Sequence, residues 1–409
     1  MSRAFLDAAL GQPLHGAAIE AREGFTDRAW PDPDQPYHEG RLSAQILNAA
    51  RETVAAVVGV SSAGVSFHPR SVIASLAVTG AHYALRAPAA QARVTEPRVS
   101  MTGDAPEPIK PAAGEPLVYS SRVERATVLN QLAALPGPTA ELLDVDRLGR
   151  IDTAKLATSL KLAGHRSTML LLQSANLELG TRQPLELIPT LSAGPPATLV
   201  TDATGSLGLI DIDSSWSVLF ADATGWAGPG DVGVLAIRDP KSWRLPSEHP
   251  LSPTIGNVNG YPTDSVGVLA ATEAAAALHA VASGRPAQTA RLTRQIERIR
   301  HELPRLVSDV DVLGDPTDRL PNIVTFSVLY ADGERLASEL DRLGVAVGSG
   351  SACASRAGLP SHVLAAIGAL THGNVRVSLP IGATDAAIDH FLAALPAAVH
   401  AVRSEAGAP

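Results

Sequence analysis

The sequence predicts an α/β fold with a mostly parallel sheet, followed by a smaller α+β domain. The first observation is a set of continuously apolar segments, typical of strands that are covered on both faces. They occupy residues 168–172, 198–202, 217–221 and 232–237. The second observation is that helical patterns alternate with these segments, as in βαβ units. The third is the length, because 409 residues can bury a large core, and we expect two domains.

The larger domain is expected to span residues 14–262. Residues 44–58 carry apolar side chains at helical spacing, which predicts an amphipathic helix. Residues 87–117 hold six prolines and little periodicity, which indicates an exposed insertion. A short strand at 116–119 and a helix at 123–132 then begin the alternating pattern.

The smaller domain is expected to combine residues 1–13 with residues 263–409. An alanine-rich helix at 264–282 would link the two domains. The remaining pattern predicts a strand, a helix, a loop, a strand and a helix at residues 323–328, 333–343, 348–358, 374–379 and 385–400.

The composition is typical of a soluble globular protein. The chain is 45% hydrophobic, has a net charge of −8 and contains no basic block of the kind that binds nucleic acid. No apolar run reaches the roughly 18 residues that span a bilayer. The first residues do not resemble a signal peptide. We therefore expect a cytoplasmic protein without nucleic-acid or membrane partners, and no motif predicts a metal site.

Cys353 is the only cysteine of the chain and lies in a run of glycine and serine. Reactive cysteines are accessible and near positive charge, so a lone cysteine on such a loop is a candidate nucleophile or sulfur carrier. The alternative is an incidental cysteine standing in for serine. His362 follows in P-S-H-V-L, where we expect it to cap or pack at a helix start.

The loop G-S-G-S-A-C at residues 348–353 resembles the active-cysteine loop of the cysteine desulfurases, which are pyridoxal-phosphate (PLP) enzymes of the class V aminotransferase fold. Further matches reach both ends of the chain, at residues 5–9, 37–41, 145–152, 180–184, 319–322 and 346–368. The resemblance implies the fold-type I PLP architecture and a dimer with its sites at the subunit interface. It also implies that Cys353 carries sulfur as a persulfide.

The lysine that such enzymes need for their Schiff base is missing. The family places it in S-x-H-K-x-x-G-P-x-G, whereas residues 222–230 read D-A-T-G-W-A-G-P-G. The Gly-Pro pair fixes the alignment, so Gly225 takes the place of the lysine. The chain has four lysines, and Lys241, which follows the next expected strand, would need a rearranged backbone to substitute.

Other positions of the family's cofactor site also differ. Arg125 replaces the ring-stacking histidine, Leu177 the second asparagine of N-N-E, and Gly205 the glutamine of D-A-x-Q. The glycine-rich phosphate loop becomes F-H-P-R-S at residues 67–71, whose proline has no N–H for a phosphate. Arg70 and Arg125 bring positive charge here, which suits either an anionic ligand or, more simply, two solvent-exposed arginines.

Three family positions are kept, and Cys353 on its loop is one of them. Asp202 matches the carboxylate that pairs with the pyridinium nitrogen, and Arg376 matches the arginine that binds the substrate carboxylate. Thr263 matches, more weakly, the residue that reaches the neighbouring subunit's phosphate. Plainer structural roles stay open: a strand-end acid satisfied by backbone N–H groups for Asp202, and a buried ion pair for Arg376.

Three hypotheses follow. In the first, the chain is a desulfurase homologue that holds no PLP covalently and cannot desulfurate cysteine alone. It would act as a non-catalytic or sulfur-relay subunit through Cys353, as a homodimer or paired with an active paralogue, with a sulfur donor or acceptor protein as partner. In the second, it is an active desulfurase or class V aminotransferase with an unusual site. In the third, it is a ligand-binding scaffold without sulfur chemistry. The missing lysine favours the first.

Overall fold

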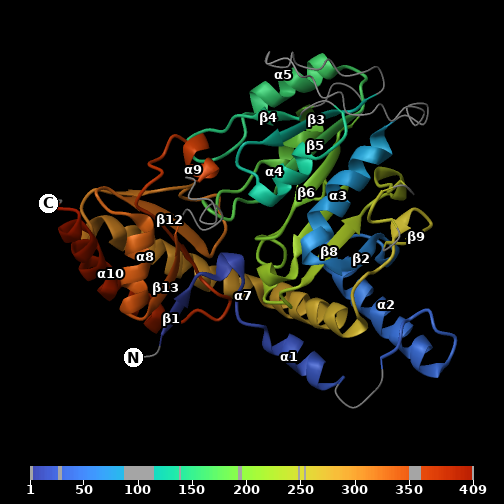
Figure 1. Ribbon diagram of the computed structural model, residues 1–409, viewed down its shortest axis with the longest axis horizontal. Helices are drawn as coiled ribbons and strands as arrows, with labels where there is room; N and C mark the ends of the chain where they lie inside the picture. Colours follow the sequence, from blue (N-terminus) through green and yellow to red (C-terminus); the bar gives the residue numbers. More distant parts are fainter. Residues whose placement is uncertain are drawn as a thin grey trace, which may run out of the picture.

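Two groups of elements lie side by side in the computed structural model, each built around its own sheet (Figure 1). The structure describes residues 3–25, 30–86, 115–137, 140–191, 196–246, 249–252, 255–349 and 361–407. Cys353 and most of its loop lie outside the described residues, as does most of the insertion expected at 87–117.

The larger group contains a seven-stranded sheet in the order β2-β8-β7-β6-β5-β3-β4. Only β8 runs against its neighbours in this sheet, so the expected mostly parallel arrangement is confirmed. The carboxyl ends of β2, β3, β5, β6 and β7 therefore meet at one edge. The strands are β2 (Val65–Pro69), β3 (Leu117–Ser121), β4 (Glu141–Leu143), β5 (Thr168–Gln173), β6 (Thr198–Asp202), β7 (Val218–Asp222) and β8 (Val232–Ile237).

Helices cover both faces of this sheet, which explains the continuous apolar runs. Successive residues of β5 enter opposite cores: Met169 packs with α3 and α4, and Leu170 with α2, α5 and α7. The helices of this group are α1 (Gly16–Glu23), α2 (His38–Val58), α3 (Arg70–Leu85), α4 (Ala126–Ala133), α5 (Thr153–Ala163) and α6 (Ile188–Leu191). A short hairpin of β9 (Asn257–Val258) and β10 (Tyr261–Pro262) follows the sheet.

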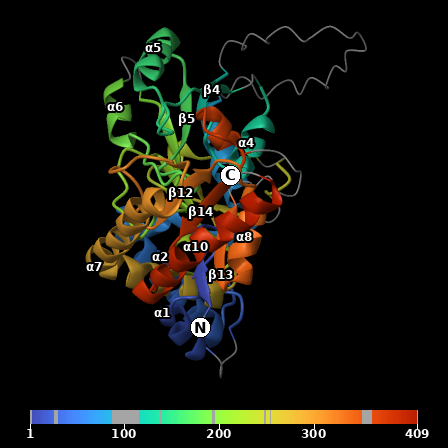
Figure 2. The same ribbon diagram turned by 90° about the vertical axis from the view of Figure 1, so that its left-hand side faces the viewer.

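The smaller group has a five-stranded sheet in the order β1-β13-β14-β12-β11. Its strands are β1 (Ala4–Leu6), β11 (Val310–Val312), β12 (Ile323–Val328), β13 (Val345–Ser349) and β14 (Asn374–Ser378). The N-terminal strand β1 joins this sheet parallel to β13. Helices α8 (Gly333–Arg342) and α10 (Asp385–Glu405) pack on the sheet (Figure 2), and the short helix α9 (His362–Ala366) faces the larger group.

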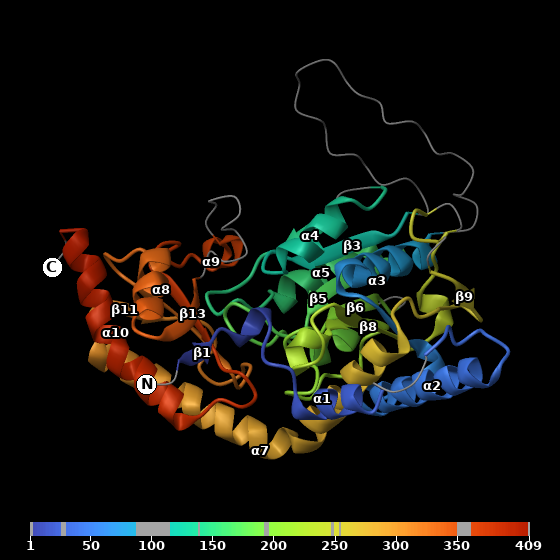
Figure 3. The same cartoon turned by 60° about the horizontal axis from the view of Figure 1, so that its bottom comes forward.

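Helix α7 (Val268–Leu306) runs beneath both groups (Figure 3). The expected end at residue 282 is wrong, and the helix begins four residues later than expected. The helix continues through Gly284 and Pro286, although an interior proline costs a helix roughly 3 kcal/mol. The second half buries Leu292, Ile296 and further apolar side chains completely. Burial of each of these side chains stabilises the fold by about 1.5–3 kcal/mol, and together they outweigh the cost of the proline.

None of the helices in the described part of the chain has the length and hydrophobicity needed to cross a bilayer.

Candidate functional site

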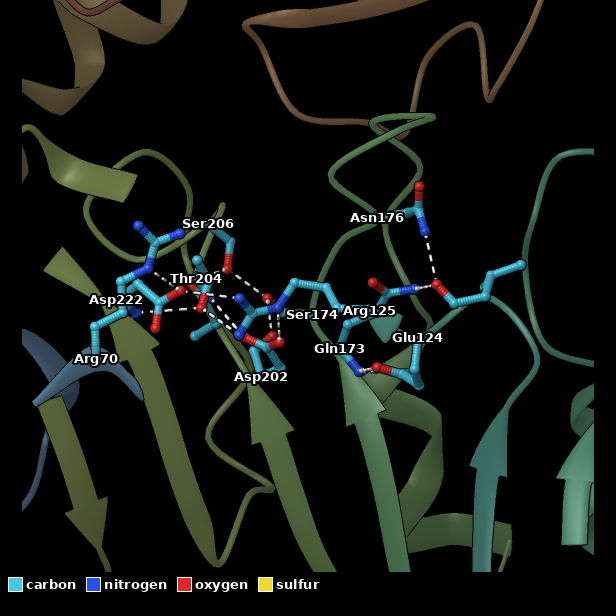
Figure 4. Close-up of polar contacts among 12 residues, drawn as sticks. Arg70, Glu124, Arg125, Gln173, Ser174, Asn176, Asp202, Thr204, Ser206 and Asp222 are labelled. Atoms are coloured by element: carbon cyan, nitrogen blue, oxygen red, sulfur yellow. Dashed lines mark hydrogen bonds and ion pairs between the residues drawn. The ribbon is translucent and has the colours of Figure 1, made fainter. Parts of the chain in front are cut away.

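The candidate site lies at the carboxyl edge of the large sheet (Figure 4). Strands β6 and β7 end in Asp202 and Asp222, and β5 ends in Gln173. Arg125 reaches this edge from the start of α4, and Arg70 from the start of α3. Open α/β sheets bind their ligands in this position.

Arg125 bridges the two aspartates. Its Nε lies 2.5 Å from Asp202 Oδ2, its Nη1 lies 2.9 Å from Asp222 Oδ2, and its Nη2 donates to Thr204 Oγ1 at 3.0 Å. Burial lowers the pKa of Arg125, but the two carboxylates outweigh this effect and hold that pKa above its usual value. The side chain is only 21% exposed. The expectation of a solvent-exposed arginine is therefore wrong here, because the two strand-end acids draw the guanidinium inward.

Asp202, which was expected to face a pyridinium nitrogen, has partners from the chain on both carboxylate oxygens. Oδ2 accepts from Arg125, and Oδ1 accepts the backbone N–H of Thr204 at 3.0 Å. It is 3% exposed. A ring nitrogen would have to displace Arg125 to reach this carboxylate.

Gly225 lies in a single 3-10 turn, Ala223–Trp226, that follows β7. A Cβ at this position would lie 2.2 Å from the carbonyl oxygen of Thr204. The turn is held on both sides, because Trp226 Nε1 donates to Ala274 O at 2.9 Å and Gln12 Nε2 donates to Gly225 O at 3.2 Å. A residue with a side chain, lysine included, therefore needs a different backbone here.

The lysines in the described part of the chain lie elsewhere. Lys241 follows β8, which runs antiparallel to β7, with Ile237 opposite Val218 and Gly233 opposite Asp222. It is exposed at the edge of the sheet opposite to the site. Lys155 on α5 pairs with Asp144, and Lys161 is exposed on the same helix. None of these three replaces a lysine at position 225.

Two of the altered positions fit each other. A Cβ added to Gly205 would lie 2.1 Å from Leu177 Cδ2, so the leucine fills the space that a larger residue at 205 would need. Leu177 packs against a small buried cluster of Ala175, Leu320 and Ile323. Where the family motifs have asparagine and glutamine, this chain has an apolar side chain and a glycine that fit each other.

We expect Gly205→Ala to lower the free energy of unfolding by about 1–2 kcal/mol in the wild-type chain, because it overpacks Leu177. In a Leu177→Ala background the same change should cost nothing, since the clash is gone. A double-mutant cycle measured by denaturant unfolding gives the coupling energy. Equal costs in both backgrounds would show that Leu177 does not fill the space at 205.

The N-terminus of α3, where the family's phosphate loop would lie, is partly occupied by the chain. The backbone N–H of Arg70 donates to Asp231 O at 2.7 Å, and its Nε to Asp222 Oδ2 at 3.2 Å. His68 is buried between the hydroxyls of Ser66 and Ser265. Burial lowers its pKa to about 3, so this imidazole is neutral and adds no charge for an anion.

Two cavities adjoin the site, of about 660 Å³ and about 530 Å³. Arg70, Gly230 and Asp231 line both, and Arg125 and Asp222 also line the smaller one. The lining of the smaller cavity includes two arginines, Arg70 and Arg125, and two aspartates, Asp222 and Asp231. Because these side chains together carry no net charge, a doubly charged phosphate gains little electrostatic stabilisation there.

Arg376, the expected substrate-carboxylate ligand, is 4% exposed in β14. Its Nη2 donates to Asp7 Oδ1 at 3.0 Å. Gly348 packs so closely that a Cβ there would lie 3.0 Å from Arg376 Nη2. Thr263 is half-buried after β10, and its backbone N–H donates to Gly256 O at 3.0 Å.

Glu178 follows Leu177 in the N-L-E segment and was not predicted as a site residue, yet its surroundings are unusual. Its Oε2 accepts from Ser361 Oγ at 2.9 Å, and its Oε1 is buried without a hydrogen-bond partner among the residues that the structure describes. Burial raises the pKa of Glu178 to about 7, although the Ser361 hydrogen bond and the charge of Arg376 oppose the rise. The sequence gives no signal of this burial, because it arises where the two groups of elements meet.

His362 packs at the start of α9, as expected. Its Nε2 lies 2.8 Å from the carbonyl oxygen of Glu124, next to Arg125 in the chain. Glu124 is fully buried, and both its carboxylate oxygens face the backbone N–H of Gln173. Burial raises the pKa of Glu124 well above its ordinary value.

An α/β sheet of this topology, with acids at its carboxyl edge and a small domain that takes in the N-terminal strand, is the architecture of class V aminotransferases. Residues 112–391 match the family described as aminotransferase class-V, and the chain belongs to it. Within the family, cysteine desulfurases are among its similar relatives. The chain is 30% identical to the cysteine desulfurase of Cereibacter sphaeroides, over 99% of this chain and 97% of that protein. It is 27% identical to cysteine desulfurase IscS of Dictyoglomus turgidum, over 98% and 95%.

Solved structures agree on the fold. A NifS-like protein superposes with a TM-score of 0.79 at 19% identity, covering 97% of this chain and 99% of that one. The apo cysteine desulfurase of Thermococcus onnurineus superposes with a TM-score of 0.76 at 18% identity, covering 98% and 95%. The resemblance to the cysteine desulfurases and the expected fold are confirmed, and the protein is cysteine desulfurase-like.

Proposed function

We propose that this protein is a cysteine desulfurase homologue that holds no PLP covalently and does not desulfurate cysteine by itself. The observation that carries the proposal is the packing of Gly225 against the carbonyl of Thr204, which leaves no room for even a Cβ. PLP enzymes of this type need a lysine side chain at that point.

Noncovalent PLP is disfavoured by the same residues. The carboxylate that would pair with the ring nitrogen is held by Arg125. At the phosphate end, the first N–H of α3 is bonded to Asp231 O, and the charges around the smaller cavity balance. The described residues therefore do not fit the cofactor.

The role that remains is that of a non-catalytic partner, with Cys353 as a sulfur carrier. In such a relay, the Cys353 thiolate attacks the outer sulfur of a donor protein's persulfide. The S–S bond of the donor breaks, the donor leaves as a thiolate, and Cys353 holds the new persulfide. This role needs a second protein as the sulfur donor, as in a pair with an active paralogue. The scaffold hypothesis predicts instead that Cys353→Ser changes nothing.

We expect the purified protein to release no sulfide from L-cysteine above the buffer blank, with or without added PLP. Titration with PLP should produce no Schiff-base absorbance, and borohydride followed by intact mass should show no fixed adduct. The desulfurase of Cereibacter sphaeroides, assayed in parallel, is the positive control. Its name and those of the other relatives favour the competing function, an active desulfurase.

Sulfide release, or an adduct that peptide mapping places on one lysine, would establish that competing function. If neither is found, the relay is tested by mixing the protein with a persulfidated desulfurase. Transfer of one sulfur to wild-type protein but not to Cys353→Ser supports the relay, and equal behaviour of both supports the scaffold.

A further inference from the structure

We infer that Asp202, Asp222 and Thr204 form a binding site for a guanidinium group, and that the chain fills this site with its own Arg125. Each of the three guanidinium nitrogens has its own acceptor, at 2.5, 2.9 and 3.0 Å. A planar fork of donors matches this arrangement, whereas an ammonium does not. Figure 4 shows the Arg125 side chain lying between the ends of β6 and β7.

The acceptors are also held in place by groups other than Arg125. Asp202 Oδ1 accepts from the Thr204 backbone N–H at 3.0 Å, and Thr204 Oγ1 accepts from the Asp222 backbone N–H at 3.2 Å. Arg70 Nε supports Asp222 Oδ2 from the other side at 3.2 Å. The site is therefore preorganised, and its shape persists when the Arg125 side chain is removed.

Charge decides which ligand class this site accepts. The side chains of Asp202 and Asp222 are only 2% and 3% exposed, and buried carboxylates are costly without a cation. Arg70 touches only Asp222 among these acceptors, so it cannot neutralise both acids. The two carboxylates repel ligands that carry a phosphate or a carboxylate. A neutral ligand is also disfavoured, because it leaves one of the buried acids without a cation. The inference rests on the proposed function, since a PLP ring paired with Asp202 would exclude the guanidinium.

The smaller cavity gives this site a route to solvent. Arg125 and Asp222 both line it, together with polar side chains of α4, Thr127, Asn130 and Gln131. Truncation of Arg125 would join the vacated space to this cavity of about 530 Å³. A free guanidinium ion is small enough to enter by that route and to replace the missing group.

The test is chemical rescue of Arg125→Ala, followed by thermal unfolding. We expect the Tm to fall by about 5–10 °C, because two buried acids lose their cation. Arg122→Ala is the matched control, since Arg122 makes an exposed ion pair with Asp144 in the same loop, and its Tm should stay within about 1 °C of wild type. Guanidinium chloride at about 20 mM should restore about 2–3 °C to Arg125→Ala, in a saturable way.

Methylammonium chloride at the same concentration should restore nothing, because it lacks the planar fork. Wild type should show no rise with either salt. The triple variant Arg125→Ala/Asp202→Asn/Asp222→Asn should regain part of the lost Tm and lose the response to guanidinium. If Arg125→Ala does not yield folded protein, Arg125→Lys is compared with Arg122→Lys and should lose about 3–5 °C more.

A Tm of Arg125→Ala equal to that of Arg122→Ala, or equal rescue by methylammonium and guanidinium, would overturn the inference. These readouts are independent of PLP. Sulfide release or a Schiff base in the wild-type protein would contradict the proposed function. The absence of selective rescue of Arg125→Ala by guanidinium would contradict this inference.

Discussion

Gly225→Ala is expected to lower the free energy of unfolding by about 3 kcal/mol, the upper end of the usual cost of overpacking a core. The added methyl group would lie 2.2 Å from the Thr204 carbonyl oxygen, and backbone on both sides of the contact must move. The turn is pinned by Trp226 and Gln12, so it has little freedom to relax. Urea unfolding followed by circular dichroism measures the change.

Gly230→Ala is the matched control, because it lies in the same loop and a Cβ there meets nothing within 4 Å. It should change the free energy of unfolding by less than about 0.5 kcal/mol. Gly225→Lys should be at least as destabilised as Gly225→Ala and should form no borohydride-stable adduct with PLP. A stable Gly225→Lys protein that forms a borohydride-stable adduct with PLP would contradict this expectation and show that the rest of the site still accepts the cofactor.

Glu178→Gln is expected to change how stability depends on pH. Burial raises the folded-state pKa of Glu178 to about 7, against an unfolded value near 4.5. An acid with a raised folded pKa contributes most stability below its unfolded pKa, and this contribution is lost as the pH rises from about 4.5 to 7. Glutamine stays uncharged and can still accept from Ser361. The variant should therefore be more stable than wild type by about 3 kcal/mol at pH 8, and by less than about 1 kcal/mol near pH 5.

Thermal or urea unfolding at several pH values between about 5 and 8 measures this difference, and subtracting the two curves removes the titration of all other groups. Glu20→Gln, on the exposed face of α1, is the control and should follow wild type throughout. A constant difference between Glu178→Gln and wild type would mean that the Glu178 carboxylate does not titrate in this window.

Most of the fold could be predicted from the sequence, because the patterns that define its strands and helices are local. Strands β6, β8 and β12 begin and end at the predicted residues, since each is a short apolar run bounded by turn residues. The end of α7 was missed because its second half is stabilised by packing against the small domain, which a local pattern of glycine and proline does not show. The start of α4 was placed three residues early, since Val123 and Glu124 belong to the turn that delivers Arg125.

The candidate site was only partly predictable. The residue types at positions 125, 177, 205 and 225 could be read from the motifs, and with them the loss of the lysine. Their mutual fit could not, because Arg125 meets acids that lie 77 and 97 residues away in the chain. The burial of Glu178 depends in the same way on contacts between distant segments, such as the one with Ser361. Cys353 remains a prediction from the sequence, since it lies outside the described residues.

The length of α7 has a practical consequence for any attempt to express the two groups of elements separately. Its first half is buried against α1 and α2, and its second half against the small domain. A chain cut after β10 would remove Val268, Ala271 and Leu278 from the larger domain and expose the apolar faces that they cover. Neither half should therefore fold when expressed alone, and limited proteolysis should yield nicked but associated fragments. For any protein that binds this chain, mapping the binding site requires point substitutions rather than truncations.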